Sequence, residues 1–433
     1  MRERGSSSIE TGGDQVTRGW ARRWLFLGAT ALVAGLLTAA AASTATEAAQ
    51  TKPLARHPAP AIPKGKPPPA HAAPPAGLAI DTVARNALII EMDTGTVLYQ
   101  KLPDQRIPPA STSKLMTAYV VFGLLKAGRA KLTDELPVSS EAWKLGGSKM
   151  FVPVGGRISI DSLLQGMIVQ SGNDSCVVLA EGLAGSQAAF VDLMNKKAAE
   201  IGLRNSHFAN VDGLPDPGDW MTARDLATLA ERTIIDFPQY YHYYSEKGFN
   251  FSNIEQGNRN PLLYNTPGAD GLKTGHTEES GFSIVGSVAR GKRRVILVLM
   301  GMPTMKARVQ ESERLAEWAF REFDDYRLFS AGDVVDEAEV WLGSAPKVAM
   351  TAGRDVVVTM PRSSRRDMKV AVNYNRPIPA PIDKGEAIGK LAVTAPGMSN
   401  VELPLYATAD VPRIGRLGRI ATMAGYLIWG NRH

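Results

Sequence analysis

Prolines recur between residues 51 and 76, interspersed with alanine, lysine and histidine. Such a composition favours extended polyproline conformers and supplies too few apolar side chains for a core. The sequence changes to apolar segments from Leu78 onward. We therefore interpret residues 51–76 as a linker and expect the folded part of the chain to begin directly after it.

An uncharged segment from Trp24 to Ala42 lies before the linker and follows Arg22 and Arg23. Basic residues before an apolar stretch, with small residues at 39–49 that offer Ala-x-Ala cleavage sites, are typical of a signal peptide. We expect residues 1–50 to be a signal peptide or an uncleaved signal anchor. The protein is thus predicted to be exported to the periplasm or cell envelope, by a route that the arginine pair alone does not decide.

The chain has 433 residues, 44% of them hydrophobic and 21% charged, enough for two globular domains plus tails. Its net charge of +6 suits anionic partners, but the tightest basic cluster, Arg362, Arg365 and Arg366, has no aromatic residue to stack on a base. We interpret the cluster as a solvated turn and expect no nucleic-acid partner. The single cysteine, Cys176, lies in an apolar run typical of a small buried side chain.

Residues 77–330 are expected to form one domain whose two ends supply strands and whose middle is helical. The predicted strands cover 87–91, 94–99, 283–289 and 294–300, and the predicted helices cover 114–126, 160–169, 174–183 and 187–201. The first two strands follow each other closely enough for a hairpin. This order favours an α/β (α+β) arrangement with one sheet shared by both ends of the domain.

Short runs of β-forming residues at 339–342, 355–360, 368–372 and 390–393 predict a small all-β domain over residues 331–410. The domain contains no catalytic motif, so we expect a spacer or protein-contact role.

Residues 411–433 place Ile414, Leu417 and Ile428 on one helical arc. The segment is too short and too basic to predict a membrane span. An amphipathic helix that associates with the outer face of the cytoplasmic membrane is expected, with packing on the β-rich domain as the alternative.

The first of three short motifs is Ser-x-x-Lys, formed by Ser111 and Lys114 at the start of a predicted helix. Residues three apart share one helix face. The lysine amine can therefore take the serine proton, provided that burial or a neighbouring cation lowers its pKa. Taken alone, the pattern also fits a capped surface helix.

The second motif is Ser171-Gly-Asn173, which follows an apolar stretch and opens the next predicted helix. A hydroxyl at this point can relay a proton, and the side-chain amide can orient a peptide group. An ordinary helix cap explains the motif equally well by itself.

The third motif is Lys273, Thr274, Gly275 and His276, shortly before a predicted strand. Gly275 would let a substrate backbone approach an edge strand, and Lys273 with Thr274 could bind a carboxylate. A basic turn leading into a strand is the alternative.

The three motifs in this order resemble those of the penicillin-recognising serine enzymes. Their longer forms are similar to the low-molecular-mass D-alanyl-D-alanine carboxypeptidases, and the similarity runs from about Leu78 to Leu405. It includes the segments 146–151 and 221–227. The resemblance implies a transpeptidase/β-lactamase-like catalytic domain, no cofactor, and peptidoglycan stem peptides and β-lactams as partners.

The resemblance also implies roles. Ser111 would attack the carbonyl of the penultimate D-alanine with Lys114 as general base, and the backbone amides of Ser111 and His276 would form an oxyanion hole. Ser171 would pass the proton to the leaving amine, and Asn173 would hold the acyl-side amide. Lys273 and Thr274 would bind the terminal carboxylate, with Arg224 as a weaker candidate for supporting that charge.

Other enzyme classes fit less well. A class A β-lactamase needs a Glu-x-x-Leu-Asn loop, and the nearest sequence, at 200–205, has an extra residue. We therefore expect long-lived acyl adducts with penicillin. A Ser-His-Asp hydrolase is disfavoured because no Gly-x-Ser-x-Gly occurs, and no metal is expected because the six histidines lack ligand spacing.

Two alternatives stay open from the sequence. An endopeptidase that cleaves D-alanine crosslinks would use the same residues. A penicillin-recognising sensor without activity is the other, although the presence of both Ser111 and Lys114 argues against it.

Overall fold

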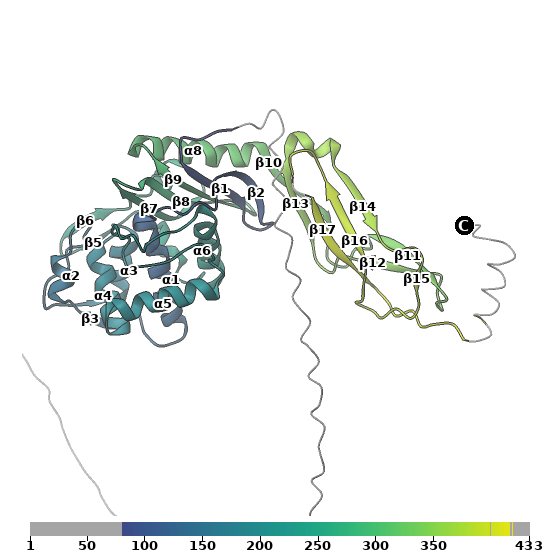
Figure 1. Cartoon of the computed structure of the whole chain (residues 1–433), viewed down its shortest axis with the longest axis horizontal. Coiled ribbons are helices and arrows are strands. Elements are labelled where there is room, and N and C mark those ends of the chain that lie inside the picture. The colour runs from purple at the N-terminus through teal and green to yellow at the C-terminus, as the bar shows by residue number, and fades with distance from the viewer. Residues whose placement is uncertain (1–79, 399, 416–417, 419–433) are drawn as a thin grey trace, which may run out of the picture. The chain divides into compact units, whose positions relative to one another are not determined.

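The computed structural model of the chain describes residues 80–398, 400–415 and 418. The predicted signal segment and linker lie outside these residues, as does most of the predicted C-terminal helix. The start of that segment is described and is not helical: Val411 and Arg413 form bridges to Ile382 and Gly343 of the β-rich domain. The described part comprises a domain of helices and one large sheet, followed by a β-rich domain (Figure 1). This confirms the predicted α/β (α+β) fold class with a second, all-β domain.

The large sheet has the strand order β2-β1-β9-β8-β7, with all neighbours antiparallel. Its strands are β1 (Asn86–Glu91), β2 (Thr96–Lys101), β7 (Ala269–Thr277), β8 (Gly281–Arg290) and β9 (Arg293–Met302). The first strand of the domain pairs along its whole length with the last one, from Asn86 opposite Met300 to Glu91 opposite Val295. The sheet is therefore shared by both ends of the domain, as the sequence predicts.

Both faces of this sheet are buried. In β9, Ile296 and Val298 point into the main helical core, whereas Leu297 and Leu299 pack with helix α8 (Met305–Glu322) on the opposite face. Alternate side chains of a strand point to opposite faces, so a strand covered on both sides needs a continuous apolar run. Figure 1 shows α8 along one face of the sheet and α1, α3, α4, α5 and α6 on the other side.

The helical core surrounds α1 (Lys114–Lys126), which is buried on nearly all sides. Four helices match their predicted bounds to within about one residue: α1, α3 (Ile160–Ile168), α4 (Asn173–Ala184) and α5 (Gln187–Glu200). The other four α-helices among the described residues have no counterpart in the sequence prediction: α2 (Ser140–Lys144), α6 (Ala223–Asp236), the one-turn α7 (Leu262–Asn265) and α8. Two small antiparallel pairs lie between these helices: β3 (Glu135–Pro137) with β4 (Arg157–Ser159) on either side of α2, and the hairpin of β5 (Gly248–Phe251) with β6 (Ile254–Gly257).

No single helix in the described ranges is both long and apolar enough to cross a membrane. Helices α4 and α5 meet that criterion only as a pair, and the pair is bent by 87° at the break between them.

The β-rich domain contains a six-stranded sheet of order β14-β16-β17-β12-β11-β15 and a separate pair, β10 with β13. Its strands are β10 (Phe323–Phe329), β11 (Asp336–Trp341), β12 (Lys347–Thr351), β13 (Val356–Pro361), β14 (Lys369–Asn373), β15 (Ile378–Pro379), β16 (Ala387–Thr394) and β17 (Val401–Ala407). Strand β10 follows α8 directly, so pairing within this domain begins at Phe323, before residue 331. Met350, Leu391 and Leu405 lie in its core.

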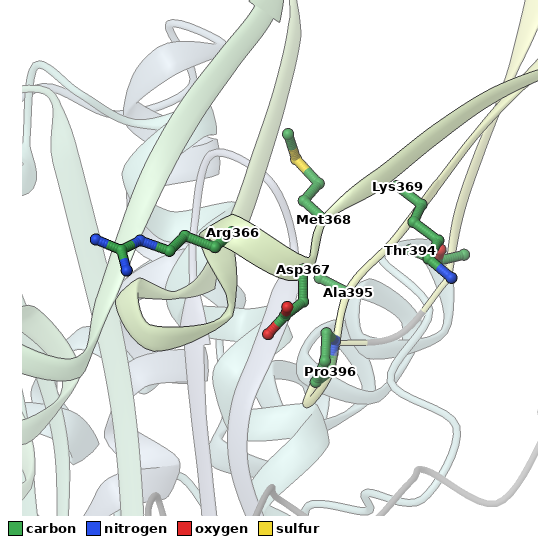
Figure 2. Close-up of a pocket in the computed structure, with 7 residues that line it drawn as sticks. All are labelled: Arg366, Asp367, Met368, Lys369, Thr394, Ala395 and Pro396. Carbon is green, nitrogen blue, oxygen red and sulfur yellow. The ribbon is translucent and has the colours of Figure 1, made fainter.

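The predicted basic turn forms a short 3-10 helix, η3 (Arg362–Asp367). Arg362 pairs with Asp324, and the Arg365 guanidinium lies 4.7 Å from the centre of the Tyr326 ring. A groove of about 510 Å³ lies between η3 and the ends of β14 and β16. Figure 2 shows that the side chains of Arg366 and Lys369 on this groove point away from each other, so their charges do not converge on one ligand position.

Candidate active site

Ser111 and Lys114 come together in a single tight turn. Ser111 lies in the 3-10 helix η1 (Ala110–Ser113), which runs directly into α1 at Lys114. A 3-10 helix stacks residue i over residue i+3, so the serine hydroxyl lies directly beside the lysine amine. The Lys114 Nζ to Ser111 Oγ distance is 2.9 Å.

Lys114 is buried, and its amine has two further acceptors, Asn173 Oδ1 at 2.8 Å and the carbonyl oxygen of Asp212. Burial lowers the pKa of Lys114, and the positive charge of Arg259 lowers it further, whereas the charges of Asp212 and Asp174 oppose this change. A lysine with a depressed pKa can lose its proton near neutral pH and act as a base.

Asn173 is held by the loop that precedes α3 and α4. Its Nδ2 donates to the carbonyl oxygen of Gly146 at 3.0 Å, and its backbone N–H donates to that of Ser148 at 2.8 Å. Ser171, two residues earlier, is buried and adopts a left-handed backbone with φ +66°. Non-glycine residues in that conformation are uncommon and cluster at functional sites.

The third motif lies shortly before β8, as expected, and itself forms part of strand β7, which the sequence does not predict and which is the edge strand of the sheet. The sequence does not predict this strand, because its polar residues do not follow the apolar pattern of a buried strand. Lys273 and Thr274 are nevertheless buried, next to the site. A Cβ atom at Gly275 would lie 3.2 Å from the Ser111 amide nitrogen, so glycine lets β7 pass close to the serine. His276 is exposed and stacks on Phe282 with 3.8 Å between ring centres.

Several positively charged side chains lie near Lys114 and Lys273. Burial lowers the pKa of Lys273 well below its ordinary value, and the charges of Lys114, Arg259 and Arg308 lower it further. Burial likewise lowers the pKa of Arg308 to about 10, with Arg259 adding to the effect. Like charges this close are stabilised by an anion, so the arrangement favours an anionic ligand.

Arg224 does not join this cluster. Its guanidinium forms a two-pronged ion pair with the Asp104 carboxylate, with its Nε 2.7 Å from Oδ1 and its Nη2 3.1 Å from Oδ2. The ion pair is partly exposed, and Arg224 opens helix α6, where its backbone N–H donates to Pro103 O.

Four residues of the site are not predicted from the sequence: Asp212, Gly213, Arg259 and Arg308. Only Arg308 leaves a signal, because it occupies the buried stripe of α8 together with Ser312 and Leu315, where an apolar residue is expected. The others lie in loops without periodicity. In the part of the chain that the structure describes, no three His, Cys, Asp or Glu residues are placed to bind a metal ion.

The chain matches the family described as D-alanyl-D-alanine carboxypeptidase over residues 70–304. Residues 323–413 match the family described as the C-terminal domain of penicillin-binding protein 5. Among curated proteins, D-alanyl-D-alanine carboxypeptidase DacA of Escherichia coli strain K12 is 36% identical over 345 residues, which covers 78% of this chain and 86% of DacA.

Solved structures give the same result. Penicillin-binding protein 5 from Haemophilus influenzae is 36% identical with a TM-score of 0.70, over 77% of this chain and 99% of that one. Penicillin-binding protein D2 from Listeria monocytogenes, solved in its ampicillin-bound form, is 28% identical with a TM-score of 0.52, over 56% of this chain and 99% of that one. The carboxypeptidase match covers more than half of the sequence, and the chain therefore belongs to the D-alanyl-D-alanine carboxypeptidase family.

Proposed function

We propose that the chain removes the terminal D-alanine of peptidoglycan stem pentapeptides, with Ser111 as nucleophile and Lys114 as general base. One observation carries this assignment: a buried lysine with a depressed pKa lies 2.9 Å from a serine hydroxyl. The reaction is that of a serine-type D-alanyl-D-alanine carboxypeptidase, which proceeds through an acyl-enzyme and is blocked covalently by penicillin.

Three oxygen atoms surround the Lys114 amine: Ser111 Oγ, Asn173 Oδ1 and Asp212 O. This number explains how the neutral amine can act as a base. An ammonium group donates three hydrogen bonds, whereas a neutral amine donates two and keeps one lone pair. Neutral Lys114 donates to Asn173 Oδ1 and Asp212 O, so its lone pair faces Ser111. The serine proton then moves to Nζ as Oγ attacks the carbonyl of the penultimate D-alanine.

The developing oxyanion would be bound by the backbone N–H groups of Ser111 and His276. The close approach of Gly275 to the Ser111 amide supports this pairing, because it brings β7 alongside η1. Two backbone donors in a water-poor site stabilise a tetrahedral intermediate more than the planar substrate.

The terminal carboxylate of the substrate would bind Lys273 and Thr274, and the charges of Arg259 and Arg308 extend this site. The mutual lowering of pKa among these cations supports an anionic ligand there. We do not assign this role to Arg224, since its guanidinium is already paired with Asp104.

The leaving D-alanine would receive its proton through the Ser171 hydroxyl, and the Asn173 amide would orient the acyl-side peptide group. Strand β7 is an edge strand, so the substrate backbone can pair with it as an additional strand.

We also propose that the protein works outside the cytoplasmic membrane, in the periplasm or cell envelope. The apolar segment from Trp24 to Ala42 supports export. The apolar arc of residues 411–433 supports attachment to the outer face of the cytoplasmic membrane.

The test combines two substrates and one variant. The purified full chain is incubated with a fluorescent penicillin and with a pentapeptide ending in D-Ala-D-Ala, and covalent label and free D-alanine are measured. We expect both signals, and Ser111→Ala should lose both while its melting temperature stays near that of the wild type. Retained label in the variant would place the nucleophile elsewhere.

A crosslinked muropeptide dimer separates the endopeptidase alternative. A carboxypeptidase releases single D-alanine from the pentapeptide, whereas an endopeptidase converts dimers to monomers. Label with neither release would indicate a penicillin-binding sensor without hydrolysis.

A further inference from the structure

Strand β7 contains one extra residue shortly before the third motif. Ala269 lies opposite Val288 of β8, whereas Gly271 lies opposite Ser287, so Asp270 has no pairing partner of its own in β8. Such an insertion is a β-bulge, which bends a strand locally and often re-aims side chains next to an active site. The bulge at Asp270 therefore sets the register in which every later residue of β7 pairs with β8.

The register after the bulge directs Lys273 to the face of the sheet that carries the catalytic serine. Lys273 lies opposite Val285, and both Val285 and Val298 of β9 pack in the main helical core. Residues that lie opposite each other in neighbouring strands point to the same face. Without the bulge, Lys273 would lie opposite Ile284, which packs on the face covered by α8. A shift by one residue thus moves the lysine to the wrong side of the sheet.

The same shift would bring a side chain against η1. Gly275 lies opposite Ser283, and even a Cβ atom at this position would be 3.2 Å from the Ser111 amide nitrogen. In the shifted register Thr274 would occupy this place, and its larger side chain would push β7 and η1 apart. The substrate site therefore depends on one register of β7 in two ways, at the lysine amine and at the glycine backbone.

A compact polar cluster holds the bulged residue. The Asp270 carboxylate forms an ion pair with Arg294 of β9, whose Nη1 lies 2.8 Å from Oδ1 and 2.7 Å from Oδ2. The same nitrogen donates to Ser287 Oγ of β8 at 2.5 Å, and the Tyr241 hydroxyl donates to Asp270 Oδ1 at 3.0 Å. The guanidinium also lies 5.5 Å from the centre of the Tyr241 ring. Arg294 thereby connects β9, across β8, to the bulge in β7.

This cluster is largely shielded from solvent. Ser287 is fully buried, and the side chains of Asp270 and Arg294 are only 27% and 22% exposed. Charge-assisted hydrogen bonds are stronger where water is mostly excluded. A Cβ atom at Gly271 would lie 2.7 Å from the Tyr241 hydroxyl, so β7 can approach the tyrosine only because residue 271 is a glycine. Side-chain bonds and close packing both hold the bulge at this position.

We propose that Asp270 locks the register of β7 through Arg294 and Tyr241, and is thereby a positioning residue for the substrate-binding part of the strand. The inference rests on the proposed binding of the terminal carboxylate of the substrate by Lys273 and Thr274. Loss of the lock lets β7 populate the shifted register, in which the lysine leaves the carboxylate site. Asp270 acts through the strand and makes or breaks no bond in the reaction.

The first experiment uses two pentapeptides that differ only at the C-terminus, which is a free carboxylate in one and a carboxamide in the other. The kcat/KM for release of the last residue is measured for the full-chain wild type, Asp270→Ala and Asp270→Asn. We expect wild type to prefer the carboxylate, and Asp270→Ala to lower this preference by at least about fivefold, because a displaced lysine affects only the charged peptide. Asp270→Asn keeps an acceptor oxygen for Arg294 and should retain most of the preference.

Hydrogen exchange of the backbone, followed by mass spectrometry, reports on the strand without any substrate. Asp270→Ala should accelerate exchange in residues 269–277 by at least about tenfold, because the strand then opens and re-pairs more often. Exchange in residues 86–91 of β1 should stay near that of wild type. Unchanged exchange in β7 would contradict the lock.

Asp104→Ala is the matched control, since it also removes a carboxylate that is bound by an arginine in the catalytic domain. Asp104 Oδ1 lies 2.7 Å from Arg224 Nε in a partly exposed ion pair at the start of α6. Neither the preference between the peptides nor the exchange of β7 should change in this variant. Equal effects of Asp104→Ala and Asp270→Ala would overturn the inference.

Arg294→Met tests whether the arginine and the carboxylate act as one unit. The variant leaves Asp270 without its ion pair, so the preference for the carboxylate peptide should fall as it does in Asp270→Ala. The double variant should be no worse than the worse of the two single variants, because both changes break the same lock. Losses that add would show that the two residues act independently and would refute a shared lock.

Other outcomes are equally distinct. Equal losses for both peptides would indicate that Asp270 has a structural role only. A lower preference with wild-type exchange in β7 would mean that Asp270 acts on the ligand through its charge, which also contradicts the inference. Failure of the proposed function looks different, because wild type would then release the last residue of neither peptide, while exchange in β7 still decides whether Asp270 holds the strand.

Discussion

Single glycines decide how closely the loops approach the catalytic serine. Gly213 adopts φ +78°, and its missing Cβ would overlap the Ala110 carbonyl oxygen and lie 2.6 Å from Ser113 Oγ. Gly202 adopts a similar φ of +83°, but nothing lies within 4 Å of the position of its Cβ. The two residues share the backbone requirement and differ only in the close approach.

We predict that Gly213→Ala lowers the penicillin acylation rate by at least about tenfold, because η1 or the 212–219 segment must shift to relieve the overlap. Gly202→Ala should cost about 1 kcal/mol for its left-handed backbone and leave acylation unchanged. Labelling kinetics and urea denaturation of both variants test this. Equal acylation rates would show that the loop yields without disturbing Ser111.

The sequence predicts some of these residues and not others. Ser111 and Lys114 lie one turn apart, so local geometry alone brings them together. Lys114 meets Asp212 across 98 positions in the chain, and no local pattern reports such a contact.

Among the structural elements, the start of α4 fixes the loop in front of the site. Both carboxylate oxygens of Asp174 are used: Oδ1 accepts from the N–H of Met150 at 3.0 Å, and Oδ2 accepts from those of Phe151 and Val152 at 2.9 and 3.2 Å. The same loop supplies the Ser148 carbonyl oxygen to Asn173. One carboxylate thus connects the helix, the loop and the amide of the second motif.

Asp174→Asn should destabilise the protein by about 2 kcal/mol, because an NH₂ group would face backbone donors in place of an acceptor oxygen. Acylation should slow as well, since the support of Asn173 loosens. Asp134→Asn is the control: Asp134 Oδ2 accepts from Lys131 N at 2.8 Å in an exposed turn, where the same change should cost under about 1 kcal/mol. Similar losses in both variants, measured by urea denaturation, would contradict this account.

Elements with clear periodicity are predictable and the others are not. Helices α3 and α5 begin after Ser159 and Ser186. The hydroxyl of each serine accepts a hydrogen bond from the backbone N–H three residues later, and such helix caps can be recognised in the sequence. Strand β7 is not predicted because it carries Asp, Gly, Lys and His at positions where strands usually carry apolar or β-branched residues. Its polar side chains are required by the site and not by the sheet.

At the scale of the whole molecule, the two ends of the catalytic domain meet in one sheet. The predicted hairpin at its start and the predicted strands at its end are confirmed as neighbours through the pairing of β1 with β9. The strand order within the sheet does not follow from the sequence, because β1, β8 and β9 are each apolar enough to occupy any central position.

Attachment to the membrane is a property of the whole chain. We predict that deleting residues 412–433 releases the mature protein from membranes, because the apolar arc with Leu417 and Ile428 would be lost. Cell fractionation followed by fluorescent penicillin labelling measures this and confirms that the truncated enzyme is folded. Continued membrane association would identify the N-terminal segment as the anchor.

The burial of Cys176 has a practical consequence. The thiol is fully enclosed, and burial raises its pKa to about 12, so it exposes almost no thiolate to reagents in solution. The chain contains no second cysteine. A single cysteine introduced on either domain can therefore carry a spectroscopic probe at one defined position, and a pair of such probes can report the distance between the catalytic and β-rich domains in the working enzyme without first removing any native residue.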